Sequence, residues 1–345
     1  MIRPGPRNLI TDVAGLRVGN AEDWAARTGV TVVLPEERAV AAVDIRGGAP
    51  GTRGTDALDP ASLVERVDAI VLSGGSEFGL DAAAGVVSWL AASGRGLDVG
   101  GVRVPVVPAA ILFDLLNGGD KDWGEDPPYR ALGREAVAAA AEDFRLGNAG
   151  AGLGAKAGQL KGGLGSVSAV DPETGATVGA LVAANPVGSV VMPGQATFWA
   201  WMLEQDDELG GQPLPTGPVG GADFSVASAL SASGRAGANT TLAVVATDAA
   251  LTRSEARRIA IMAHDGFARA IRPVHTPFDG DVVFALSTGR RVLPERRAVA
   301  VARLGAIAAD AVARATARGV YLADGLGDKP GYRALHGVML RCSGT

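Results

Sequence analysis

Short Val-rich runs alternate with Ala-rich stretches of helical length along almost the whole chain. Strand-like runs lie at 31–34, 39–44, 67–72, 102–107, 166–170, 177–183, 240–246 and 282–286. Helices are expected at 78–92, 127–144, 252–271 and 296–318. Thr252 and Glu255 form a capping-box signature at the start of the third helix. Because strands and helices mix from end to end, the predicted class is α/β or α+β, with sheets and helices packed in layers.

The composition is that of a compact folded protein and argues against several classes of function. Hydrophobic residues make up 47% and charged residues 20% of the 345 residues, which is not the profile of a disordered chain. The net charge of −5, with both signs interspersed, predicts no nucleic-acid partner. No signal peptide or membrane-spanning run is apparent, so no membrane partner is expected. Cys342 is the only cysteine, which excludes an intramolecular disulfide and favours a soluble cytoplasmic protein.

Glycine accounts for 49 of the 345 residues, about twice the usual share. The segment 150–155 loosely matches a dinucleotide fingerprint, but a second glycine-rich stretch and a hairpin follow it where a long helix is required. The segment 47–55 lacks the Gly-Lys-Ser/Thr ending of a phosphate-binding loop. We therefore expect these glycines to serve tight turns and close backbone approaches, with no nucleotide or other cofactor.

The turn around Ser76 has a strand–turn–helix pattern that suggests a nucleophile elbow. The glycine expected two residues after the serine arrives one residue late. His264, His275 and His336 are the candidate bases, and none has a compelling local partner in the sequence. A structural or anion-accepting turn is the favoured interpretation.

Asp279 and Asp281 place two carboxylates two residues apart on an extended segment that follows His275. Spacing alone leaves two interpretations open. The pair could be a solvated turn, or it could orient a cationic or hydroxyl group. The local oxygen ligands are too few for a metal ion, so no metal is expected.

At Asn239 and Thr240 a stretch of small residues, 225–239, runs directly into a strand-like run. A loop entering a strand is the plainer interpretation. The alternative is chemical: a threonine hydroxyl needs a base near neutral pH. If the bond before Thr240 is cut, its new α-amine, with a pKa of about 7.7–8.0, lies on the same residue as the hydroxyl. The hydroxyl could also begin that cut by attacking the Asn239 carbonyl.

Nine short segments, taken in order, carry a resemblance to a known family. They are 10–20, 43–48, 72–80, 108–114, 148–152, 161–165, 185–188, 239–241 and 279–281. Together they cover most of the chain, and no single one is decisive. The chain resembles the self-processing N-terminal-nucleophile hydrolases that include L-aminopeptidase/D-esterases, β-peptidyl aminopeptidases and nylon-oligomer endohydrolases.

The resemblance implies a fold, a processing event and an assembly. The implied fold is a four-layer αββα sandwich in a single domain, 1–345. The implied precursor is cut between Asn239 and Thr240 into an α fragment, 1–239, and a β fragment, 240–345. The paired fragments of such proteins frequently assemble into tetramers, so a homo-oligomer is expected.

Site roles also follow from the resemblance. Thr240 would be the nucleophile and, through its amine, the base. Asn185 matches the asparagine that supports the oxyanion or the nucleophile. Asp279 and Asp281 match the pair that orients the N-terminal group in the nylon-oligomer hydrolases.

Two positions depart from the family pattern. Lys161 is the best match to a family lysine, although ungapped alignment with the nylon-oligomer enzymes puts Gln159 there. Several members have a tyrosine in the oxyanion site where this chain has Phe113, which cannot donate a hydrogen bond. Either another donor replaces the tyrosine or the substrate preference differs.

The predicted function is hydrolysis of linear amides through an acyl-enzyme on Thr240. The expected substrates are short peptides with a free amine or ω-amino-acid oligomers of nylon type. Two rivals remain open on the sequence. One is an acyltransferase that passes the acyl group from Thr240 to an amine, and the other is a non-catalytic binding protein on the same scaffold.

Overall fold

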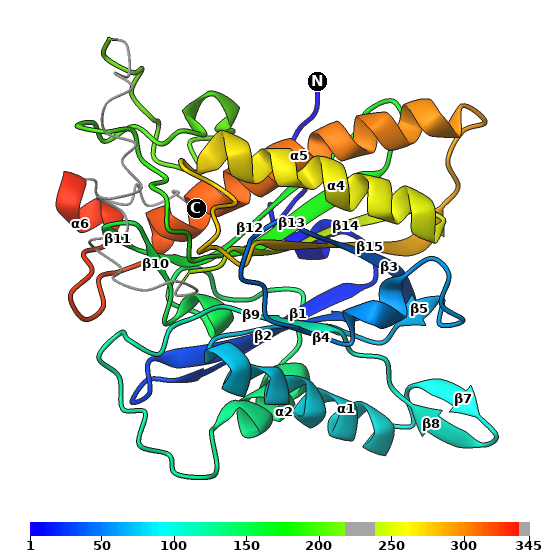
Figure 1. Cartoon of the computed structure of the whole chain (residues 1–345). Helices are drawn as coiled ribbons and strands as arrows, with labels where there is room; N and C mark the ends of the chain where they lie inside the picture. The colour runs from blue at the N-terminus through cyan, green and yellow to red at the C-terminus, as the bar shows by residue number, and fades with distance from the viewer. Residues whose placement is uncertain (218–238, 338–345) are drawn as a thin grey trace.

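The computed structural model describes residues 1–217 and 239–337, and it arranges them in four layers (Figure 1). Two β-sheets pack face to face in the middle, and a pair of helices covers the outer face of each sheet. The layering is αββα, and the mixture of sheets and helices confirms the predicted class. In the described part of the chain, no helix combines the length and the hydropathy required to cross a membrane.

The first sheet has six strands in the order β12-β13-β14-β15-β3-β5. The strands are β12 (Gly163–Val170), β13 (Thr177–Ala184), β14 (Leu242–Ala249), β15 (Val282–Arg291), β3 (Ala39–Ile45) and β5 (Arg66–Val67). Only β14 and β15 among these neighbours run parallel, and the other pairs are antiparallel. The two strands that follow Thr240 therefore lie between β13 and β3, which both precede it in the chain.

The second sheet has five strands in the order β1-β2-β6-β9-β4. The strands are β1 (Leu16–Asp23), β2 (Thr28–Pro35), β6 (Ile70–Ser73), β9 (Ala109–Ile111) and β4 (Thr52–Arg53). Two small two-stranded ribbons, β7 (Leu97–Val99) with β8 (Val102–Val104) and β10 (Lys156–Ala157) with β11 (Leu160–Lys161), complete the described strands.

Four long helices form the outer layers. Helices α4 (Arg253–Ala270) and α5 (Arg297–Leu322) cover the six-stranded sheet, and α1 (Ala82–Ala92) and α2 (Tyr129–Ala138) cover the other. A short helix, α6 (Tyr332–His336), follows near the end of the described chain. Burial follows the layers, with one apolar core between the sheets and one under each pair of helices.

Most expected elements are found, and Thr252 caps α4 as expected: its side chain accepts from the Glu255 N–H at 3.2 Å. The helix expected at 127–144 is wrong at its end, because α2 stops at Ala138. Ala141 instead exchanges backbone hydrogen bonds with Val18 of β1, at 2.9 and 3.1 Å. The chain leaves the helix here to extend the edge of a sheet.

Several strand boundaries were also wrong. The run 67–72 is divided between β5 and β6, which belong to different sheets. The run 102–107 keeps only Val102–Val104 as strand, in an exposed hairpin. The run 240–246 becomes strand only at Leu242, so Thr240 lies just outside regular β14.

Candidate active site

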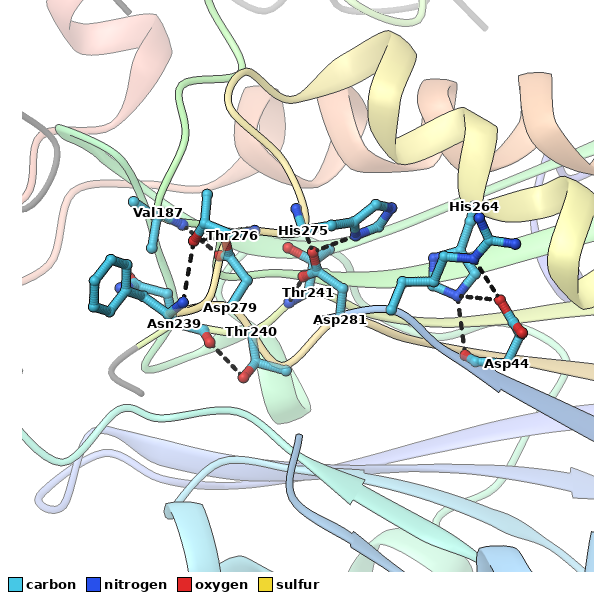
Figure 2. Close-up of polar contacts among 12 residues, drawn as sticks. Asp44, Val187, Asn239, Thr240, Thr241, His264, His275, Thr276, Asp279 and Asp281 are labelled. Atoms are coloured by element: carbon cyan, nitrogen blue, oxygen red, sulfur yellow. Dashed lines mark hydrogen bonds and ion pairs between the residues drawn. The ribbon is translucent and has the colours of Figure 1, made fainter. Parts of the chain in front are cut away.

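Thr240 is buried where two neighbouring strands begin. Because β14 and β15 are parallel neighbours, the segments that lead into them lie side by side. Asn239 forms a parallel bridge with Asp279, and both residues, like Thr240, are no more than 2% exposed. Figure 2 shows Asn239, Thr240 and Thr241 beside Asp279 and Asp281. The topology therefore brings together two motifs that lie some 40 positions apart in the sequence.

The hydroxyl of Thr240 lies against the carbonyl of the preceding residue. Thr240 Oγ1 donates to Asn239 O at 2.6 Å, and the backbone N–H of Gly280 donates to the same oxygen at 3.1 Å. The Thr240 N–H donates to the backbone carbonyl of Asn185 at 2.8 Å. The arrangement places a hydroxyl, a carbonyl oxygen that accepts two hydrogen bonds and an anchored amide nitrogen at one peptide bond.

Position 280 has no room for a side chain, which is why it is a glycine. A Cβ atom there would lie 2.6 Å from Thr240 Oγ1 and 2.6 Å from the carbonyl oxygen of Ala49. The loop that contains Ala49 is bonded to the same turn, with Ala49 N–H donating to Asp279 O at 2.8 Å and Arg46 N–H to Asp281 O at 3.1 Å. The glycine-rich segment after β3 thus packs against the turn beside Thr240, as the structural interpretation of its glycines expects.

Asp279 holds backbone on the far side of the turn. Its carboxylate accepts from the Val187 N–H at 3.0 Å and from the N–H and hydroxyl of Thr276 at 3.1 and 2.6 Å. Burial, followed by the neighbouring carboxylate of Asp281, raises the pKa of Asp279 above its ordinary value. In the described structure Asp279 makes no hydrogen bond to Thr240, so it holds the backbone around Thr240 and does not contact its side chain through a hydrogen bond.

Asp281 connects the residue after Thr240 to a histidine. One carboxylate oxygen accepts from the Thr241 N–H at 2.8 Å. The other lies 2.8 Å from His275 Nδ1 and also accepts from the His275 N–H at 3.2 Å (Figure 2). Sequence reasoning named His275 only as a possible base for Ser76. Its position six residues before Asp281, in the same turn, is the signal that could have revealed this contact.

A second histidine continues the network away from Thr240. The His264 ring lies edge-on to His275, with 5.0 Å between ring centroids. His264 Nε2 lies 2.9 Å from the backbone oxygen of Asp44 and 3.4 Å from its carboxylate. Burial lowers the pKa of His264 to about 4, so this histidine is neutral at physiological pH.

Asn185 joins Thr240 to a neighbouring pocket. It follows β13 directly, is fully buried, and its backbone carbonyl holds the Thr240 N–H. Its side-chain Nδ2 donates to the carbonyl of Phe113 at 3.2 Å, and its Oδ1 accepts from the Lys156 N–H at 2.9 Å. Phe113 and Lys156 both line the pocket, so Asn185 connects this pocket to Thr240 through hydrogen bonds.

The pocket has a volume of about 130 Å³ and contains Lys161 in its wall. Lys161 is 2% exposed, and its Nζ donates to the carbonyls of Gly152 and Gly162 at 2.9 and 2.7 Å. Burial lowers the pKa of Lys161 to about 7, and the charge of Asp114 opposes that shift. Gln159, the alternative match to the family lysine, is exposed, so the structure places Lys161 in the better position for a role in the pocket.

Asp114 is a buried carboxylate that sequence reasoning left without a role. It accepts from the Gly75 N–H and from the Thr28 hydroxyl, each at 2.7 Å, and burial raises its pKa. Gly75 and Ser76 both have positive φ angles, 86° and 52°. The turn at Ser76 is thus held by a hydrogen bond from the Gly75 N–H to Asp114. Within 1–217 and 239–337, no histidine forms a hydrogen bond with Ser76. The structural interpretation of this turn is favoured over the nucleophile elbow.

The structure brings Asn185, Asn239, Thr240, Asp279 and Asp281 together and places Lys161 in the adjoining pocket. Comparison with known proteins identifies the family of the chain. A sequence model of peptidase family S58 matches residues 8–333.

Relatives and solved structures agree with that match. An uncharacterized aminopeptidase of Mycobacterium tuberculosis (strain H37Rv) is 46% identical, over 94% of this chain and 97% of the relative. A 6-aminohexanoate-oligomer endohydrolase of Kocuria sp. (strain KY2) is 30% identical, over 89% of this chain and 84% of the relative. The L-aminopeptidase D-Ala-esterase/amidase of Ochrobactrum anthropi, described as a variant of the Ntn hydrolase fold, has a TM-score of 0.67 at 21% identity, over 98% of this chain and 96% of that chain.

Proposed function

Because the chain belongs to peptidase family S58, we propose that Thr240 is its nucleophile and that the chain cuts its own backbone between Asn239 and Thr240. Its family and relatives indicate an amide-bond hydrolase of the N-terminal-nucleophile type. The observation that carries the proposal is the position of Thr240 Oγ1, 2.6 Å from the carbonyl oxygen of the bond to be cut.

Self-cleavage begins with attack of Thr240 Oγ1 on the carbonyl carbon of Asn239. The Gly280 N–H, 3.1 Å from the carbonyl oxygen, stabilises the negative charge that develops there. As the C–N bond breaks, the hydroxyl proton is transferred to the departing nitrogen, and an ester joins Asn239 to Thr240. Water then hydrolyses the ester, which leaves a carboxylate on Asn239 and a free hydroxyl and amine on Thr240. The products are the fragments 1–239 and 240–345.

The same residue then acts on substrates. The new α-amine of Thr240, with an ordinary pKa of about 7.7–8.0, accepts the proton of its own hydroxyl near neutral pH. The hydroxyl attacks the substrate carbonyl, the amine part of the substrate leaves, and water releases the acyl group from Thr240. The carbonyl of Asn185 already holds the Thr240 nitrogen in the uncut chain, at 2.8 Å, and keeps the amine beside the hydroxyl.

The oxyanion donor cannot be the side chain at position 113, because phenylalanine has no hydroxyl. Among the described residues, the Phe113 carbonyl is the one acceptor of Asn185 Nδ2, at 3.2 Å, which is the long end of the hydrogen-bond range. A substrate oxyanion beside Thr240 can replace that acceptor. The Asn185 amide, supported by the backbone N–H of Gly280, is therefore our candidate for the donor that the missing tyrosine would have supplied.

The substrate we infer is a linear amide, either a short peptide with a free amine or an oligomer of an ω-amino acid. Relatives named as an aminopeptidase and as a 6-aminohexanoate-oligomer endohydrolase support this substrate class. The small pocket beside Asn185, with a volume of about 130 Å³, favours extended, narrow chains over bulky ones.

Assembly and location complete the proposal. We expect the two fragments to remain paired and the pairs to form a homo-oligomer, with a tetramer as the first candidate. The cytoplasmic location rests on the single cysteine, Cys342, which lies outside the described residues. Native mass spectrometry of the purified protein would count the chains in the assembly.

A matched pair of variants tests the nucleophile. Thr240→Val removes the hydroxyl without changing the shape of the side chain, and hydrolysis of aminoacyl amides and linear 6-aminohexanoate oligomers should fall by about 10³-fold or more. Thr241→Val makes the same change one residue later, where the buried hydroxyl has no hydrogen-bond partner within the described chain, and activity should persist. Full activity in Thr240→Val would overturn the proposal.

A further inference from the structure

The lysines of this chain are concentrated in one place. Of its 32 lysine and arginine residues, only Lys121, Lys156, Lys161 and Lys329 are lysines. All of these except Lys121 line the pocket beside Asn185. Arginines supply nearly all of the ion pairs elsewhere in the described chain, so the ammonium groups of this pocket are not part of a general surface pattern.

The pocket carries a surplus of positive charge. Lys156 is half-buried, and in the described chain no carboxylate lies within ion-pair distance of its Nζ. Lys329 has one carboxylate neighbour, Asp328, at 3.8 Å, and that carboxylate is 80% exposed. Asp114 is the other acid in the wall, but its oxygens already accept from the Gly75 N–H and the Thr28 hydroxyl. Two ammonium groups are therefore open to a ligand.

The wall also has an apolar part, formed by Phe113, Leu116 and Leu326. A pocket that combines apolar side chains with ammonium groups fits a chain of methylene groups that ends in a carboxylate. Lys161 is the least suitable of the three cations for this task, since its Nζ is bonded to two backbone carbonyls and burial lowers its pKa to about 7.

We propose that this pocket binds the terminal carboxylate of a linear amide substrate through the ammonium groups of Lys156 and Lys329. The inference rests on the proposed function, because it takes Thr240 as the nucleophile. In a linear amide the free carboxylate lies on the amine side of the bond that is cut, so the pocket belongs to the leaving group. Asn185 lies between them, bonded to Thr240 on one side and to Phe113 and Lys156 on the other.

The test compares two substrates that differ only at the end predicted to enter the pocket. A linear 6-aminohexanoate trimer with a free carboxylate and the same trimer as its carboxamide are assayed with the wild type. We expect kcat/KM to favour the carboxylate by about tenfold or more, the usual effect of a charge-assisted hydrogen bond. Lys156→Gln and Lys329→Gln should each lower that ratio, and the double variant should bring it close to one.

The design has a control and an independent arm. Lys156→Gln removes the ammonium group but keeps the backbone N–H that donates to Asn185. Arg103→Gln is the control: it removes one positive charge from an exposed hairpin outside the pocket, and it should leave the kcat/KM ratio of the two trimers unchanged. Titration calorimetry with the two trimers measures the same preference as binding. If the wild type hydrolyses neither the trimers nor aminoacyl amides, the proposed function fails, and the calorimetric ratio alone decides the pocket. Equal affinity for both trimers, or a ratio that the double variant does not change, would overturn the inference.

Discussion

The carboxylate of Asp281 holds two groups at once, the backbone N–H of Thr241 and the ring of His275. Thr240 itself is positioned mainly by backbone groups. Its N–H donates to the Asn185 carbonyl, and its hydroxyl donates to the Asn239 carbonyl, which also accepts from the Gly280 N–H. At the scale of single residues, the carboxylates therefore matter through the geometry that they impose on the chain around Thr240.

Asp281→Asn tests that positioning role. The amide can still accept from the Thr241 N–H, but it loses the charge that pairs with His275. We expect self-cleavage to slow by up to about 10²-fold, the effect of a small displacement of reacting groups. A time course of fragment formation on a denaturing gel measures the rate, and a rate equal to that of the wild type would show that the contact between the Asp281 carboxylate and His275 is dispensable.

Lys161 gives a pH-dependent prediction for stability. Burial lowers its pKa from 10.5 to about 7, so between pH 7 and 10.5 the unfolded chain binds a proton that the folded chain has lost. The free energy of unfolding contributed by this group therefore rises with pH across that window. The stability of the wild type relative to Lys161→Met, from urea unfolding, should rise between pH 7 and 9. A constant difference would contradict the shift.

Sequence reasoning could name Thr240, Asn185, Asp279 and Asp281 because each belongs to a short motif. It gave no role to Gly280, although that glycine is central to the motif. The reason is physical, since the value of the Gly280 N–H depends on β14 lying next to β15, and no local pattern specifies which strands are neighbours.

At the scale of elements, the turn between α4 and β15 is the part that most directly serves Thr240. Gly280 in this turn has no positive φ, so alanine is compatible with the backbone, and only its Cβ would clash with Thr240 Oγ1 and Ala49 O. Gly280→Ala should therefore slow or abolish self-cleavage. Gly289→Ala is the control, because a Cβ at position 289 meets nothing within 4 Å. The φ of +72° there should make this substitution lower the free energy of unfolding by only about 1 kcal/mol. Normal fragment formation in Gly280→Ala would exclude the crowding that we describe.

Element boundaries show where local patterns stop being informative. The helix from Arg253 was predictable because its capping box and its period agree with its surroundings. The helix from Tyr129 was predicted too long because Ala-rich sequence continues past its end, where Ala141 instead pairs with Val18. Tertiary pairing overrides a weak intrinsic preference.

At the scale of the whole molecule, the proposed cut lies just before β14 and would leave two fragments that share one sheet. Strands β14 and β15 of the β fragment lie between β13 and β3 of the α fragment. The cut fragments should therefore remain together in native buffer, eluting as one species on size exclusion, and should separate only in denaturant. Separation of the fragments under native conditions would contradict this interleaving.

The class of fold followed from the mixture of strands and helices, whereas the order of the strands did not. The αββα layering was expected only through the family resemblance. Runs such as 67–72 look like one strand but are divided between two sheets, because burial on both faces produces the same apolar pattern in either sheet.

Intact mass spectrometry of the purified wild-type chain under denaturing conditions tests the central claim most directly. We expect two masses, corresponding to 1–239 and 240–345, whose sum exceeds that of the uncut chain by one water. Thr240→Val should give one full-length mass, and Thr241→Val should give the two fragments. A single full-length mass from a wild-type preparation that hydrolyses amides, or a cut at another bond, would contradict the account.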